Sequence, residues 1–348
     1  MKPIPLPLLT LYADLVQQLE ASTDRSATIS RQILAGREYL RAIYRVGKTQ
    51  RSIHLGPADD PDVVAKADAM AREQALAKER RTIVSSLRRS IPGPSGQLGT
   101  VLEVIADAGL FRPTDGALGA VLVGAAAFQT YSAALGKVLP GAQLVTADVD
   151  LATAHLALAP DDRGHPDDHG DDDGEPRKRG RPAERPTMEQ ILKRADSTFS
   201  GLLQLNTRDP PSRFRAANGF MVDLLTPTDS RDDRNPMPLP GLKAGAVPLQ
   251  YLKWLITDPL PAAVLHGSGI LVTVPDPARY AIHKLIVAKV RNATSGKQMK
   301  DLAQAKALME AIGDWDQRIG DLIDDAKSNG PKWERAIVES LAQIRSRA

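Results

Sequence analysis

The sequence predicts an α+β protein: a small mixed β-sheet flanked by helices, with an N-terminal α+β unit and a C-terminal helical lobe. Three observations predict this class. Apolar residues recur at helical spacing in long charged segments, short apolar runs next to glycines have the length of buried strands, and only helical patterns follow Pro277. A chain of 348 residues, 42% of them hydrophobic, can form more than one domain with a sizeable core.

Composition excludes several kinds of site. Cysteine is absent, which excludes disulfides, thiolate metal sites and a cysteine nucleophile. The start of the chain lacks the features of a signal peptide, and no apolar run reaches the roughly 18 residues of a membrane span. We therefore expect a soluble, cytoplasmic protein that does not contact membranes. A net charge of +3 is too small to indicate nucleic-acid binding by itself, although the pI of about 9.0 leaves it open.

The N-terminal unit is predicted to comprise residues 1–95, before the linker-like segment 92–96 opens the next domain. Its many arginines and lysines indicate either a solvated surface or a surface for nucleic acid or a protein partner. Its expected elements are an amphipathic helix over 5–20, a hairpin over 38–55 that turns near Gly47, and a long charged helix that begins at the cap signal Asp60-Pro61.

The next segment, residues 97–152, has the order helix, strand, glycine, helix, strand. The first strand ends at Gly124, and the helical pattern "AAAFQTYSAALGKVL" follows it directly. A glycine at such a turn allows another group to approach the backbone closely, and a helix N-terminus favours an anion. The pattern indicates a phosphate-binding turn.

Two aspartates occupy the second strand of that segment. Asp148 and Asp150 are two residues apart, so both side chains lie on one side of a strand. Like charges there repel each other, unless a divalent cation lies between them and a phosphate. A third acid, Asp223, stands alone in the apolar run "FMVDLLT" after the hairpin signal Asn218-Gly219.

These residues resemble the DNA polymerase β-like nucleotidyltransferase superfamily. More closely, the chain resembles bacterial nucleotidyltransferase-fold proteins near the AbiEii-type toxins, which have a C-terminal pattern like "PARYAIHKLIVAKVRN". The resemblance covers roughly residues 97–312. It implies a nucleotidyltransferase domain over 96–276, a helical lobe over 277–348 and a requirement for Mg²⁺ or Mn²⁺.

The resemblance also implies roles for single residues. Asp148 and Asp150 would bind the metals, and Asp223 would bind the second metal and help to activate the incoming hydroxyl. Nucleotide phosphates would meet the turn at Gly124 and Ala125, and two basic residues, Lys284 and Arg279. The same reasoning leaves other assignments open: Lys284 pairing with Asp301, and Arg279 capping its helix. Ala125 and Ala126 depart from the serine or glycine that commonly follows the glycine in this superfamily.

A polar insert separates the second and third acids. Residues 160–186 have almost no apolar side chains, which predicts a disordered segment. Within it, residues 176–182 resemble an AT-hook, a basic arm for narrow A·T minor grooves. That resemblance predicts a DNA contact through Arg179, Gly180, Arg181 and Pro182.

Downstream of the insert, the patterns predict further elements. Thr187 and Gln190 suit a capping box at the start of a helix. After the third acid we expect a helix over 247–256, a strand over 269–275 and four helices from Pro277 onward.

The function that these patterns predict is metal-dependent transfer of a nucleoside monophosphate from an NTP to an acceptor hydroxyl. The acceptor is an RNA, a protein or a small molecule. The alternative is a non-catalytic module with the same fold, which binds DNA or a protein partner through residues 1–95 and the basic insert.

Overall fold

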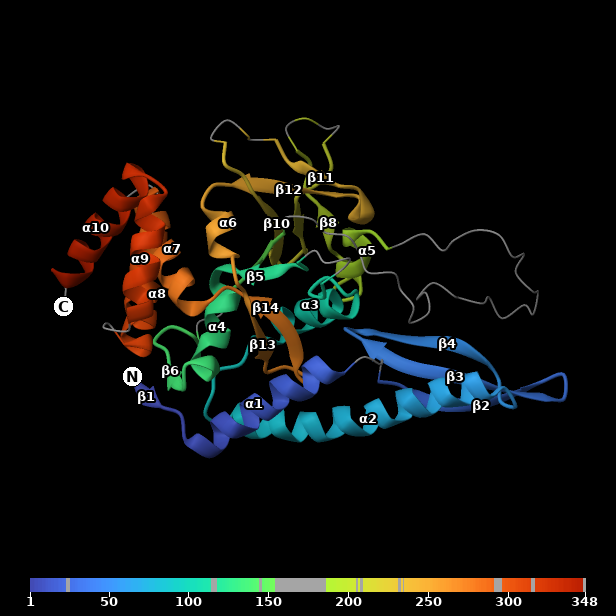
Figure 1. The fold of residues 1–348 in the computed structure, drawn as a ribbon. Coiled ribbons are helices and arrows are strands. Elements are labelled where there is room, and N and C mark those ends of the chain that lie inside the picture. The colour runs from blue at the N-terminus through green and yellow to red at the C-terminus, as the bar shows by residue number, and fades with distance from the viewer. Residues whose placement is uncertain are drawn as a thin grey trace.

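The computed structural model confirms the α+β class that the sequence predicts (Figure 1). It describes residues 1–22, 26–113, 118–143, 146–153, 186–204, 206, 209–230, 233, 235–290, 296–313 and 317–346. The predicted insert 160–186 and its AT-hook-like residues Arg179, Gly180, Arg181 and Pro182 lie outside the described residues, except for Pro186. No described helix is long and apolar enough to cross a membrane.

The N-terminal part contains two helices and a three-stranded sheet. The elements are β1 (Lys2–Pro3), α1 (Leu6–Ala21), β2 (Thr28–Leu34), β3 (Arg37–Val46), β4 (Thr49–Pro57) and α2 (Pro61–Leu87). The predicted hairpin is confirmed, and Gly47 turns it with φ +59°. Asp60 caps α2 as predicted, because its Oδ1 accepts from the backbone N–H of Asp62 at 2.9 Å.

The sequence patterns missed β2. This strand pairs with β3 in antiparallel register and completes a sheet in the order β2-β3-β4. Its side chains are exposed or half-buried along the whole strand. A strand without a buried face does not need alternating apolar and polar residues, so the sequence carries no clear strand pattern there. Pairing with β3 and packing against α2 therefore decide its conformation.

The central sheet is mixed and has seven strands among the described residues. Strands β7, β10 and β12 run parallel, whereas β5, β9 and β11 are antiparallel to their neighbours. The order along the sheet is β11-β12-β10-β7-β5, with β9 beside the first half of β10 and β8 beside β9. The elements of this part are α3 (Gly96–Asp107), β5 (Val121–Val123), α4 (Gly124–Ala134), β6 (Lys137–Val138), β7 (Asp148–Ala152), α5 (Met188–Lys193), β8 (Ser200–Gly201), β9 (Arg213–Arg215), β10 (Met221–Pro227), β11 (Met237–Leu239) and β12 (Ala244–Leu249).

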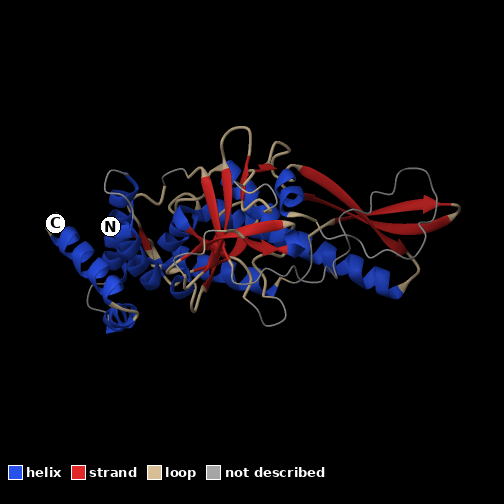
Figure 2. Cartoon of the chain, turned by 90° about the horizontal axis from the view of Figure 1, so that it is seen from above, coloured by secondary structure: helices blue, strands red, loops and turns tan. Residues whose placement is uncertain are grey.

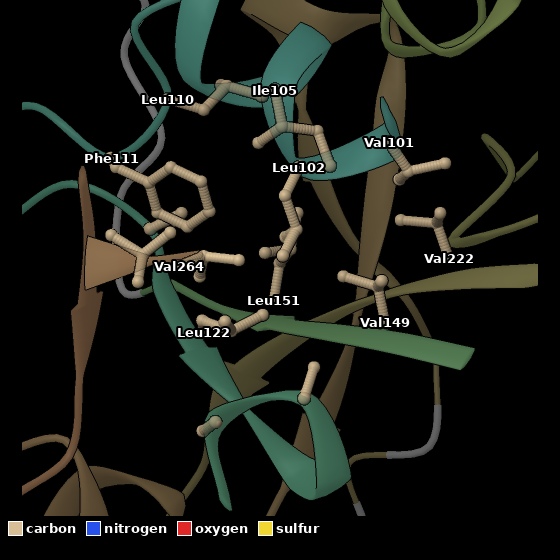
Figure 3. Close-up of a cluster of buried hydrophobic side chains, with 14 of the residues drawn as sticks. Val101, Leu102, Ile105, Leu110, Phe111, Leu122, Val149, Leu151, Val222 and Val264 are labelled. Atoms are coloured by element: carbon tan, nitrogen blue, oxygen red, sulfur yellow. The ribbon is translucent and has the colours of Figure 1, made fainter. Parts of the chain in front are cut away.

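One face of this sheet forms the main core. Strand residues Leu122, Leu151 and Val222 are fully buried, and helix α3 covers them with Leu102 and Ile105 (Figure 3). Alternate strand residues point to opposite faces of a sheet. The packing of this face on α3 therefore directs the remaining side chains of β7 and β10 to the opposite face.

The C-terminal part contains a hairpin and the four predicted helices, which are confirmed among the described residues. The elements are α6 (Leu252–Leu255), β13 (Leu260–Val264), β14 (Ile270–Val274), α7 (Pro277–Val290), α8 (Gly296–Ile312), α9 (Gln317–Ser328) and α10 (Pro331–Arg345). The helix predicted over 247–256 is wrong in its first half, because residues 247–249 belong to β12 and residues 250–251 form a turn. Tyr251 has φ +69° and separates this strand from the short α6.

Leu102 lies at the centre of the core, with 1% of its surface exposed. We expect Leu102→Ala to lower the free energy of unfolding by about 2–5 kcal/mol, because it removes buried methyl groups and leaves a cavity. Leu203, 89% exposed, is the matched control, and Leu203→Ala should change the stability little. Urea unfolding of both variants measures the difference. Equal effects would contradict the position of the core.

Candidate functional site

A single row of residues crosses four strands of the central sheet. Val123 of β5 pairs with Asp150 of β7, Asp150 pairs with Asp223 of β10, and Asp223 pairs with Arg213 of β9. Asp150 and Asp223 are thus neighbours on parallel strands, and their side chains leave the sheet on the same face. Asp148 lies on that face too, because it is two residues from Asp150.

The three aspartates line the face that is not packed on α3. The side chains of the three aspartates are half-buried. Val149, between Asp148 and Asp150, and Val222, directly before Asp223, are completely buried on the other face. Burial of the valines determines which way the aspartates point. If either strand shifted by one residue in register, the aspartates would be buried and the valines exposed. The structure therefore brings Asp148, Asp150 and Asp223 together on one surface.

Gly124 lies directly beside Asp150. It begins helix α4 with φ +65°, a conformation that favours glycine. A Cβ atom at this position would lie 2.1 Å from Oδ2 of Asp150. The close approach that the glycine permits is thus used by the carboxylate, which lies at the N-terminus of α4. Ala126 is buried behind the turn, while Ala125 is half-buried.

Arg213 binds the third acid with both arms of its guanidinium. Nε donates to Oδ1 of Asp223 at 2.6 Å, and a terminal nitrogen donates to Oδ2 at 2.8 Å. These hydrogen bonds raise the pKa of Arg213 above its ordinary value, and the charges of Asp223, Asp150 and Asp148 raise it further, while desolvation opposes them. One guanidinium therefore offsets part of the repulsion among three carboxylates.

Asp148 is held at the start of β7 by a neighbouring hydroxyl. The buried Thr146 donates from Oγ1 to Oδ1 of Asp148. This contact orients the carboxylate before the strand begins.

The expectation of three carboxylates around shared cations differs from the observed geometry. Within the described ranges, no group of three or more histidine or acidic side chains is placed to hold a metal ion. The bidentate pairing with Arg213 gives the reason, because it turns both oxygens of Asp223 toward β9. Asp148 and Asp150 still supply hard carboxylate oxygens, which are the donors that Mg²⁺ and Mn²⁺ prefer.

Tyr280 joins the C-terminal lobe to the site. Its hydroxyl donates to the carbonyl oxygen of Gly124 at 2.7 Å, and its ring meets the edge of Tyr131 at 5.2 Å between centroids. Tyr280 is 1% exposed. Sequence reasoning missed both Tyr280 and Arg213. A signal for Tyr280 was present, since it lies in the pattern "PARYAIHKL". Arg213 lies in the other strand of the hairpin, but the two-residue loop that Asn218-Gly219 indicates would place it opposite Leu224 rather than Asp223.

The two predicted basic residues of α7 are engaged with other groups. Lys284, 8% exposed, forms an ion pair with Asp301 at 2.7 Å, as one reading of the sequence predicts. Lys284 follows Tyr280 by four residues, about one turn of α7. Its ammonium lies 5.2 Å from the centroid of the Tyr280 ring. Arg279 stacks over Trp254 at 4.9 Å and lies 3.6 Å from a carboxylate oxygen of Asp258. Their contacts with a nucleotide stay a prediction.

Comparison with known proteins gives one family. A family model described as Nucleotidyltransferase matches residues 96–169 and 178–328, more than half of the chain, and the match includes all three aspartates. No curated protein matches the chain. Among solved structures, the chain is similar to an antigenic nucleotidyltransferase-like protein from Paracoccidioides brasiliensis, at 15% identity, with a TM-score of 0.31, over 71% of this chain and 94% of that chain. The finer resemblance to AbiEii-type toxins stays a prediction.

Gly124 can be tested by adding a single carbon atom. We expect Gly124→Ala to lower the free energy of unfolding by more than the roughly 1–2 kcal/mol that a left-handed backbone costs an alanine, because the new Cβ also displaces Asp150. Gly36→Ala isolates the backbone cost, since Gly36 has φ +78° and nothing within 4 Å of its Cβ position. Guanidinium unfolding compares the two variants. An equal loss in both would refute the contact with Asp150.

The pairing of Arg213 with Asp223 can be measured by a double-mutant cycle. We expect Arg213→Ala and Asp223→Ala to give a coupling free energy of about 1 kcal/mol at low salt, at the upper end for exposed pairs, because the contact is bidentate. Arg335 and Glu339 of α10 form a more exposed pair, for which a smaller coupling is expected because solvent screens it more. Urea unfolding of the two sets of variants gives both values. A coupling near zero for the first pair would show that Arg213 does not offset the charge of the acids.

Proposed function

Because the chain belongs to the nucleotidyltransferase family, we propose that it transfers a nucleoside monophosphate from an NTP to an acceptor hydroxyl. One observation carries the proposal: Asp150 and Asp223 are neighbours on parallel strands, with Asp148 on the same face and Gly124 at the adjoining helix start. Carboxylates gathered at a helix N-terminus suit a substrate that brings both phosphate groups and divalent cations.

In the proposed reaction, the acceptor oxygen forms a bond to the α-phosphorus of the NTP. The bond between that phosphorus and the oxygen that bridges it to the β-phosphorus breaks, and pyrophosphate leaves. We assign the proton of the acceptor hydroxyl to Asp223. A carboxylate has about four acceptor positions, so the two hydrogen bonds from Arg213 leave Asp223 able to accept another.

Asp148 and Asp150 would hold the Mg²⁺ or Mn²⁺, with Asp223 joining them when its pairing with Arg213 loosens. When bound, the ions would neutralise phosphate charge and align the attacking and leaving oxygens. The chain itself contributes position: Thr146 orients Asp148, and the glycine turn keeps Asp150 at the N-terminus of α4.

The phosphates are proposed to meet the backbone at Gly124 and Ala125. With alanine after the glycine, backbone N–H groups rather than a hydroxyl would make the contact. Lys284 would contribute a positive charge close to this turn, at the cost of its ion pair with Asp301. Arg279 would serve the same purpose from the first turn of α7.

The test compares Asp150→Asn with Asp68→Asn, an exposed aspartate of α2 that serves as the matched control. Each protein is incubated with Mg²⁺ or Mn²⁺, an α-labelled NTP, and total cellular RNA or protein. We expect Asp150→Asn to abolish label transfer, and Asp68→Asn to retain it. Thermal unfolding should also show that metal plus NTP stabilises only proteins with an intact site, since a ligand of the folded state raises stability by mass action.

The same variant separates a catalytic from a structural aspartate. Without metal, Asp150→Asn should be as stable as the wild type or slightly more stable, because one repelling charge is lost. Unfolding of the apo variant would mean that Asp150 is structural. A wild type that is stabilised by no nucleotide would support the non-catalytic alternative instead.

A further inference from the structure

The three-stranded sheet of β2, β3 and β4 has one face packed on α2 and one that no described helix or strand covers. On β3, Leu40, Ala42 and Tyr44 are buried against the helix side, while alternate residues are exposed or half-buried. The sheet and α2 extend away from the central sheet (Figures 1 and 2). By register, the residues of the open face, called here the free face, are Thr28, Ser30, Gln32, Leu34, Arg37, Tyr39, Arg41, Ile43, Arg45, Gln50, Ser52 and His54.

The free face carries positive charge and no acidic residue. The sequences of the three strands contain five arginines and one acid, Glu38, which points away from the free face and pairs with Arg31 at 3.0 Å. Arg37 pairs with Asp59, which follows the end of β4, at 2.9 Å. Arg41 donates to the neutral amide oxygen of Gln32 at 3.0 Å, and it forms no ion pair with a carboxylate in the part of the chain that the structure describes.

Arg45 adds a second positive charge to the same face of β3. It is exposed, and among the described residues it has no ion pair with a carboxylate. Arg41 and Arg45 are four residues apart on one strand, with Ile43 between them on the same face. Beside them the face is hollowed by about 350 Å³, and Ser30, Gln50 and Ser52 are among the residues that line the hollow.

An aromatic pair lies next to this charge. The rings of Tyr39 and His54 are 5.2 Å apart between centroids, and His54 is the cross-strand partner of Arg41. Tyr39 is half-buried and His54 is exposed, so the pair offers ring surface at the face. Stacking rings beside positive charges are what proteins use to bind single-stranded nucleic acids, whose bases are unstacked and whose backbone is anionic.

We propose that the free face binds single-stranded RNA, with Arg41 and Arg45 at phosphates and a base stacked on Tyr39 and His54. A duplex fits less well, because its bases are already stacked and offer no ring face. Ser30, Gln32, Gln50 and Ser52 carry hydroxyl and amide groups that match the 2′-hydroxyl, which is both donor and acceptor. Binding itself does not need the transfer reaction; only the role of this RNA as acceptor rests on the proposed function.

The experiment measures fluorescence anisotropy of a labelled single-stranded RNA of about 16 nucleotides, without NTP or metal. The double variant Arg41→Ala/Arg45→Ala should bind at least tenfold more weakly, and the slope of log affinity against log salt should fall by about 1.4, since two phosphate contacts are lost. Lys300→Ala/Arg335→Ala removes two exposed charges from α8 and α10 and should bind like the wild type.

Further variants separate charge, stacking and sugar recognition. Arg41→Lys/Arg45→Lys and Tyr39→Phe should retain most of the affinity, whereas Tyr39→Leu should lose about fivefold or more. Far-ultraviolet circular dichroism confirms that each variant is folded. Equal affinity of the Arg41→Ala/Arg45→Ala variant and the wild type, or no RNA binding by the wild type, overturns the proposal. Equal or tighter binding of a DNA strand of the same sequence overturns the choice of RNA. Loss of nucleotidyl transfer leaves all these measurements unchanged, because the assay contains no NTP.

Discussion

The side-by-side placement of two carboxylates, Asp150 and Asp223, on parallel strands is the constraint on which the rest of the structure depends. Two negative charges at neighbouring positions repel each other, so the fold must supply compensation at that place. Positive charge meets the two carboxylates from both sides. Arg213 of β9 binds Asp223 on one side, and the N-terminus of α4 approaches Asp150 on the other, where Gly124 leaves room for the carboxylate.

The opposite face of the same strands supplies the stability that this arrangement needs. Completely buried valine and leucine residues of β5, β7 and β10 pack on α3 (Figure 3). This burial opposes any slip in register, because a shift of one residue would expose the apolar set and bury the acids. A site built from repelling charges is thus held by the apolar side chains that alternate with them.

Tyrosine hydroxyls connect the surrounding parts to this sheet. Tyr280 of α7 donates to the carbonyl of Gly124, and Tyr131 of α4 donates to the carbonyl of Pro275, just before α7, at 2.9 Å. Tyr12 of α1 accepts from the backbone N–H of Ala263 at 3.1 Å, and burial raises its pKa to about 12. Each bond satisfies a buried polar group and fixes one element against another. The N-terminal sheet is joined in a similar way, since the N–H of Lys48 donates to the carbonyl of Arg194 at 3.1 Å. Buried residues of β3 also belong to the same hydrophobic core as those of β7 and β10, so the sheet with the proposed RNA-binding face packs against the part that carries the aspartates.

The sequence by itself determined what depends on local spacing: the helices with their caps, the hairpin at Gly47, and the common side of Asp148 and Asp150. Only the tertiary structure decided what depends on partners distant in the chain. A two-residue loop of Asn218 and Gly219 would place Leu224 opposite Arg213, whereas the observed register places Asp223 there. In the same way, β2 and residues 247–249 became strands because neighbouring strands paired with them. Side-chain direction within a strand follows from its period of two, but the register between strands is set by turn length and by burial across the whole sheet.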